Sequence, residues 1–136
     1  MTDRDVSFDP VVDEELVETV KAAADGPVFV VVEFTPDEFS VTYASSATRD
    51  MYEDEDAMYD YFESVHEYVN LDLTEIDLFT ENLFPVADDV RYITTALDIG
   101  KMIRVYVGDR RGVFVGLPTE AEVEPVVEAL FDESDR

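Results

Sequence analysis

The sequence predicts an α+β fold, a mostly antiparallel sheet of about five strands with helices packed on it. Runs rich in β-branched and aromatic residues follow one another with only short turns between them, as in an antiparallel sheet. Segments with a helical spacing of apolar residues precede, separate and follow these runs. The predicted order is helix, strand, strand, helix, an irregular stretch, three strands and a helix. We expect one domain over residues 1–136, with frayed tails at 1–8 and 132–136.

The first helix is expected to begin at Asp9 and Pro10, because aspartate suits the N-cap and proline the first helical position. Gly26 ends it. Between them, apolar side chains recur at helical spacing: Val12, Leu16, Val20 and Ala23. This stripe should face the sheet.

Two strands should follow this helix. Val28–Phe34 lacks polar–apolar alternation and is rich in valine, which indicates a strand covered on both faces. A turn containing Pro36 leads to Phe39–Ala44, where aromatic and aliphatic residues alternate as in a partner strand. Because the first strand is apolar on both sides, the sheet should carry helices on both faces.

Arg49–Asn70 is predicted to be one long amphipathic helix that Ser45 or Ser46 caps. At about 100° per residue, one side is apolar: Met51, Met58, Phe62, Val65 and Val69. The opposite side is acidic: Glu53, Asp56, Asp60, Glu63 and Glu67. Tyrosines and the chain's single histidine, His66, lie along the borders. We interpret the acidic side as a solvated helix face.

Leu71–Asp89 fits neither period and is predicted to form short irregular elements, although its leucines and phenylalanines resemble core residues. Three strands should follow, at Val90–Leu97, Lys101–Val107 and Gly112–Leu117. A bulged hairpin should join the last two, with Gly112 at positive φ.

The chain should end in a helix. Thr119 and Glu122 have the spacing of a capping box, and Pro125 marks a kink or a second start. The apolar stripe that follows has helical spacing: Val123, Val126, Val127, Leu130 and Phe131. This helix should also pack on the sheet.

The predicted order of elements is similar to the α-β-β-α-β-β-β-α arrangement of Roadblock and profilin-like domains. Two stretches, "EFTPDEFSVTYASSATRD" and "IRVYVGDRRGVFVG", also look like small uncharacterised proteins of haloarchaea. What they share is an aromatic-Thr-x-Asp-x-Phe hairpin, followed later by a Gly-Asp-Arg-x-Gly-Val hairpin. These resemblances imply a fold and a haloarchaeal source, and they imply no activity.

The charge of the chain is unusual, because 34 acidic residues against nine basic ones give a net charge of −25. Hydrophobic residues still make up 46% of the chain, which argues against disorder. Such a chain repels itself in dilute buffer, whereas about 1 M salt shortens the Debye length to roughly 3 Å. The acids are spread along the whole chain, which favours a halophilic protein. Without a signal peptide or a membrane-spanning run, we expect a soluble, cytoplasmic protein.

The sequence supports no class of enzyme. The absence of cysteine removes disulfides, thiolate ligands and thiol nucleophiles. Glu63 and His66 have the spacing of a di-iron ligand pair, but that site needs a second such pair. The glycines form no phosphate-binding loop and the serines no nucleophile elbow. We therefore expect no catalytic residue, no metal and no cofactor.

Five of the nine basic residues lie between residues 91 and 111, where Asp98 and Asp109 are the only acids. The basic island consists of these five residues and a tyrosine on the strand face of Arg104: Arg91, Lys101, Arg104, Tyr106, Arg110 and Arg111. Two interpretations stay open: the cations pair with the acidic helix faces, or they contact an acidic partner or an anion. The net charge argues against nucleic acid. Arg110 and Arg111 are placed at the hairpin tip, where packing should make no demand for them.

The primary functional interpretation is a non-enzymatic interaction or regulatory domain, halophilic and cytosolic. The alternative is a domain that binds a small ligand or an anion through the basic island Arg91–Arg111. Three helices should leave apolar sheet surface uncovered, and such surface usually marks an interface. We therefore expect a homodimer that buries sheet surface or the Met51–Val69 helix, and expect neither a membrane nor a nucleic-acid partner.

Overall fold

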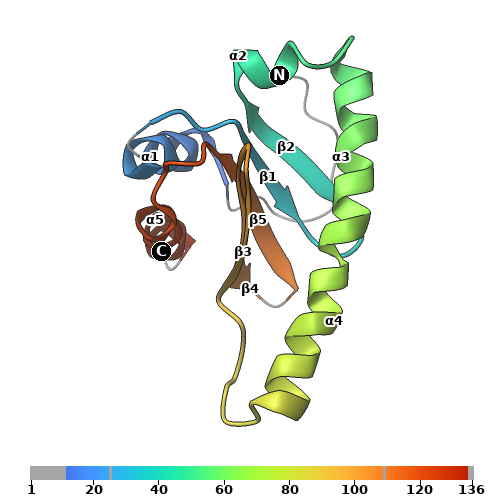
Figure 1. Ribbon diagram of the computed structural model, residues 1–136, viewed down its shortest axis with the longest axis vertical. Coiled ribbons are helices and arrows are strands. Elements are labelled where there is room, and N and C mark those ends of the chain that lie inside the picture. Colours follow the sequence, from blue (N-terminus) through green and yellow to red (C-terminus); the bar gives the residue numbers. More distant parts are fainter. Residues whose placement is uncertain (1–11, 25, 109, 135–136) are drawn as a thin grey trace.

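The computed structural model describes residues 12–24, 26–108 and 110–134, which form a five-stranded antiparallel sheet flanked by helices (Figure 1). The strands are β1 (Val30–Phe34), β2 (Phe39–Ala44), β3 (Tyr92–Leu97), β4 (Gly100–Gly108) and β5 (Arg111–Leu117), in the spatial order β2-β1-β5-β4-β3. The helices are α1 (Glu14–Ala24), α2 (Ser46–Arg49), α3 (Glu55–Val69), α4 (Leu71–Leu78), the π-helical turn η1 (Phe79–Leu83) and α5 (Val123–Ser134). The predicted α+β class and element order are confirmed.

The strand β1 contributes to the core on both faces of the sheet. All five of its residues are buried. Val31 packs in the cluster formed with α1 and α5, whereas Val30 and Val32 pack in the cluster formed with α3. The pair α1 and α5 therefore covers one face of the sheet and α3 lies over the other (Figure 1). The predicted coverage of this strand on both faces is confirmed.

The starts of α1 and α5 differ from the predictions. In α1, Asp13 Oδ1 accepts a hydrogen bond from the Leu16 amide at 2.8 Å, and the helix begins at Glu14. The predicted start at Asp9 and Pro10 lies outside the described residues. In α5, the helix begins only at Val123, so the predicted capping box is wrong. The Thr119 hydroxyl instead bonds the adjacent Glu120 carboxylate at 2.8 Å.

The long helix predicted for Arg49–Asn70 is divided into α2 and α3. Ser45 caps the first and Asp54 the second, each accepting a backbone N–H bond, at 3.1 and 2.8 Å. The division leaves Met51 in the connection, 75% exposed, so its predicted place in the buried stripe is wrong. The rest of the stripe faces the sheet, as predicted: Met58, Phe62, Val65 and Val69.

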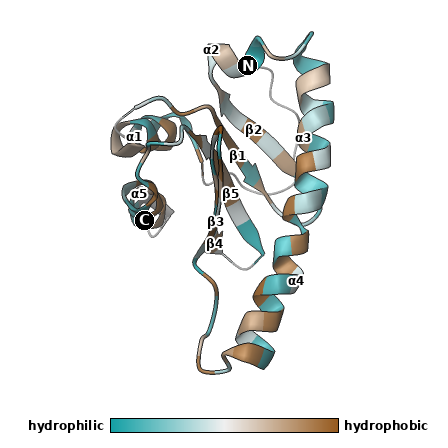
Figure 2. Cartoon of the chain, in the orientation of Figure 1, coloured by the Kyte–Doolittle hydropathy of each residue, from teal (hydrophilic) through white to brown (hydrophobic). Residues whose placement is uncertain are grey.

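Most of the stretch predicted to be irregular is helical, as α4 and η1, whereas residues 84–89 form neither helix nor strand, as predicted. Neither α4 nor η1 has a buried residue, and α4 continues past the end of the sheet (Figure 1). Apolar segments recur along α4 between polar ones, without forming one apolar side (Figure 2). A helix that rests on no core needs no amphipathic period, which is why the sequence showed none. The expectation that the leucines and phenylalanines of this stretch are core residues is also wrong, since Leu71 and Phe84 are 64% and 55% exposed.

The β4–β5 hairpin corrects the role given to Gly112. Positive φ occurs at Arg110, at 53°, and at none of the described glycines. Gly112 lies under an aromatic ring instead, because a Cβ there would be 2.5 Å from Phe34 Cζ. The glycine thus permits close packing of β5 against Phe34.

Candidate functional site

The α3 layer covers only part of its face of the sheet. The strand residues buried beneath it come from β1, β2 and β5. Beside it lie two adjoining hollows of about 280 and 340 Å³, which share Tyr61, Val65, Met102 and Phe114. We call this continuous depression the α3 groove. It lies between α3 and the outer strands β4 and β3.

One end of the α3 groove is apolar and open. Met51 and Ile99 on its rim are 75% and 79% exposed, and Leu97 and Tyr61 beside them are exposed as well. The Tyr52 and Tyr61 rings are 5.6 Å apart. Burial, and then the neighbouring Tyr61, raise the pKa of the Tyr52 hydroxyl, which keeps it neutral. This end can therefore contact apolar side chains.

The other end of the α3 groove is lined by a polar cluster around Arg104, which is 7% exposed. Its Nε donates to Asp72 Oδ2 at 2.8 Å, and its Nη1 donates to Thr95 Oγ1 at 2.8 Å and to the Met102 carbonyl at 3.0 Å. The Tyr106 hydroxyl donates to the same Asp72 Oδ2 at 3.2 Å. Burial, and then the Asp72 carboxylate, raise the pKa of the Tyr106 hydroxyl, which remains a donor.

Two hairpin-tip residues of the basic island have different surroundings. Arg110 Nη2 lies 3.0 Å from Asp77 Oδ2, and both side chains are 48% exposed. Arg111 bonds Glu33 Oε2 through Nε and Nη2, at 3.0 and 2.8 Å. Glu33 is 1% exposed and its Oε1 also accepts from the Val12 amide. The expectation that packing makes no demand at the tip is therefore wrong for Arg111.

The remaining members of the basic island, Lys101 and Arg91, contact residues in α5 or just before it. Lys101 Nζ donates to the Ala121 carbonyl at 2.7 Å. The Arg91 guanidinium lies 4.7 Å from the centre of the Phe131 ring. The structure thus brings Arg104 and Tyr106 together at Asp72 and directs the other cations to separate partners.

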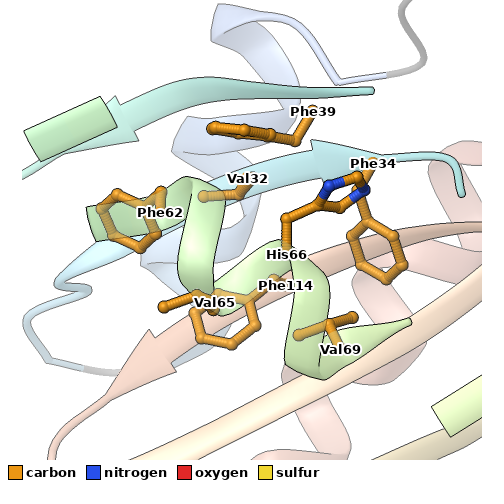
Figure 3. Close-up of a pocket in the computed structure, with 8 residues that line it drawn as sticks. All are labelled: Val32, Phe34, Phe39, Phe62, Val65, His66, Val69 and Phe114. Carbon is orange, nitrogen blue, oxygen red and sulfur yellow. The ribbon is translucent and has the colours of Figure 1, made fainter. Parts of the chain in front are cut away.

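His66 is held inside the packed layer between α3 and the sheet (Figure 3). Its Nε2 is 2.6 Å from the Thr35 carbonyl oxygen, and its ring lies between those of Phe34 and Phe39. The hollow beside it holds about 10 Å³. With Asn70, which donates to the Pro36 carbonyl at 2.8 Å, His66 fastens the β1–β2 turn to α3.

Among the described residues, no group of three or more histidine or acidic side chains is placed to hold a metal ion. In the same part of the chain, no helix is long and apolar enough to cross a membrane.

Sequence reasoning missed the α3 groove. The prediction placed Met51 inside a helix and gave no role to Leu97 and Ile99. The available signal was the turn "LDIG", in which apolar residues flank Asp98 at a place where a turn normally carries polar ones. Exposed apolar residues in a turn indicate contact with something outside the chain.

Comparison with known proteins identifies the fold. The crystal structure of a Roadblock/LC7 domain from Streptomyces avermitilis superimposes on this chain with a TM-score of 0.50, covering 85% of this chain and 88% of that one. The two sequences are 13% identical, so the likeness concerns the fold. No known family model matches the sequence, and none of the curated proteins does. The chain has a Roadblock/LC7-like fold, as its order of elements suggested.

Proposed function

We propose that this protein is a non-enzymatic protein-interaction domain that docks its partner in the α3 groove. The observation that carries the proposal is the apolar, open end of this groove, where Met51, Tyr61, Leu97 and Ile99 are exposed together. Contiguous exposed apolar surface of this kind marks interfaces in proteins that are otherwise polar outside. A net charge of −25 makes the contrast sharper here.

The partner we propose is a second copy of the chain. Strand β3 is at the edge of the sheet and pairs with β4 alone among the described strands, so its outer backbone groups are available for another strand. The α3 groove borders this edge. If two β3 edges paired about a twofold axis, each α3 groove would lie against the partner's α3. One interface would then cover both the β3 edge and the groove.

The charge distribution supports this location. The lining of the α3 groove carries only Lys101 and the paired Asp72 and Arg104 as charged groups. The acidic side of α3 points to solvent, and Asp60 and Glu67 there are exposed. Two copies would therefore meet where their mutual repulsion is weakest. We further propose that the protein works in a salty cytoplasm, which screens the remaining charge.

An anion or small-ligand site at the basic island is the less supported alternative. Arg104, Arg110 and Arg111 each contact a carboxylate of this chain. An anion would have to displace that carboxylate. Lys101 is also engaged, at the Ala121 carbonyl. We therefore give protein docking precedence.

Charge reversal on the rim of the groove tests the proposal. The double variant M51E/I99E places two carboxylates on a surface that should be buried between copies, while both side chains are already exposed in one copy. We expect the wild type to be a dimer by light scattering in about 2 M KCl. We expect the variant to be a folded monomer, with a melting temperature lower than that of the wild type only by the stabilisation that dimerisation adds.

The matched control is V86E, which adds a carboxylate at a 95% exposed apolar residue away from the groove. It should remain dimeric. A wild type that is monomeric at micromolar concentrations would exclude the second copy as occupant. A dimer that M51E/I99E leaves intact would exclude the groove as the interface.

A further inference from the structure

The segment from α4 to the start of β3 is attached to the sheet by polar contacts. Neither α4 nor η1 has a buried residue, whereas α1, α3 and α5 each contribute several to the core. Asp72 accepts from Arg104 and Tyr106, and Asp77 accepts from Arg110. These hydrogen bonds join α4 to β4 and to the hairpin tip.

A cavity of about 510 Å³ separates this segment from the layers behind it. Leu73 and Ile76 of α4 line one wall, and Val107 of β4 and Phe131 of α5 line the opposite wall. The apolar side chains of α4 therefore stand apart from the core. The free energy that holds the segment in place must come mainly from its polar bonds and from its two chain ends.

We propose that Leu71–Asp89 is a latched strap, which opens locally while the sheet and the helices α1, α3 and α5 stay folded. Asp72 and Asp77 are its two latches. Segments with few buried apolar contacts open at a small fraction of the global unfolding free energy. The Asp77–Arg110 latch is half exposed, so that water and salt compete with it directly.

The latch at Asp72 connects the two hollows of the molecule. Asp72 and Arg104 line the α3 groove, and Tyr106 lines the cavity behind the strap. Both donors bond the same oxygen, Asp72 Oδ2. Opening of the strap moves Asp72, and therefore changes the end of the groove that Asp72 lines and uncovers the cavity in one event. The strap does not require the groove to be occupied.

Hydrogen–deuterium exchange of the full chain tests the strap. In the wild type, the amides of α4 and η1 should exchange much faster than those of α3 and β4. The double variant D77N/Y106F removes one exposed ion pair and one hydrogen bond while the buried Arg104–Asp72 pair remains. Exchange in the strap should become about tenfold faster, the combined effect of two such contacts. Exchange in α3 and β4 should not change.

The matched control is E18Q, which removes the exposed Lys21–Glu18 pair in α1 and should leave the strap unaffected. Two outcomes overturn the proposal: a strap as protected as α3, or a double variant that accelerates exchange equally in every element.

A second measurement uses the absence of cysteine. Spin labels on E81C and E128C, both at exposed positions, should give a broader distance distribution in D77N/Y106F than in the parent. An unchanged distribution also contradicts the strap.

Discussion

The same residue type has different consequences at neighbouring positions of the β4–β5 hairpin. Arg110 takes positive φ and pairs at the surface with Asp77. Arg111, the next residue along the chain, neutralises the buried carboxylate of Glu33. A buried carboxylate that loses its partner keeps its desolvation cost without compensation, whereas an exposed one is solvated by water. The two arginines are therefore not equivalent, although they are adjacent in the sequence.

Charge reversal separates the two arginines. R110E should lower the free energy of unfolding by about 1 kcal/mol or less, because the pair is half exposed. R111E should lower it by about 3–5 kcal/mol, because it breaks a buried pair and adds a second carboxylate beside Glu33. Urea unfolding of both variants at one salt concentration measures the difference. Equal losses would mean that the Glu33 pair contributes little.

Tyr106 predicts how stability depends on pH in the alkaline range. An unfolded tyrosine loses its proton near its ordinary pKa of about 10, while the folded hydroxyl, whose pKa is raised, keeps it. The unfolded state then binds fewer protons, so stability should fall as pH rises above about 10. Y106F should show a smaller fall than the wild type in urea titrations across this range. The pKa of the Tyr52 hydroxyl is also raised, so Y52F is compared with Y106F in the same titrations. A wild type and Y106F with parallel profiles would contradict the role of Tyr106.

At the scale of elements, the sequence predicts well those segments that rest on a core. The stripes of α1, α3 and α5 and the two-sided β1 could be predicted because burial imposes a period on the sequence. Helix starts were misplaced where several residues could serve as a cap, as at Thr119. The helix α4 could not be predicted because it rests on no core, and the α3 groove could not because it forms only where separate elements meet.

The cap of α3 gives a prediction for that element. D54A removes the side chain that accepts from the Ala57 amide, so the free energy of unfolding should fall by about 1 kcal/mol. D60A is the control, because it removes an exposed carboxylate from the same helix without touching a cap. It should be neutral or slightly stabilising, since alanine favours helix and one repulsive charge is lost. Equal effects of the two variants would show that Asp54 acts only through its charge.

The whole molecule combines an ordinary core with an extreme surface charge. The two apolar clusters lie on either side of a continuous sheet, and the net charge is −25. Core packing is little affected by ionic strength, whereas repulsion between surface carboxylates is strongly screened. Stability should therefore depend on salt through the surface alone.

A salt series tests this dependence. The melting temperature should rise steeply between dilute buffer and about 1 M KCl, the range in which the Debye length falls to roughly 3 Å. Sucrose at matched osmolality is the control, because it favours compact states without screening charge. A melting temperature that is flat or falls with KCl, or that rises equally with sucrose, would contradict the halophilic interpretation.

The strand order has a consequence for how the chain reaches its fold. The central strands β1 and β5 are neighbours in the sheet, yet Val30 pairs with Gly116 from the far part of the sequence. During synthesis, the β1–β2 hairpin emerges long before β5 and must wait with an apolar edge unpaired. Folding of such a non-local sheet is slow compared with that of helical domains. In dilute buffer its many carboxylates would keep unfolded chains apart, so the surface charge that destabilises the folded state there would also oppose aggregation of chains that are still folding.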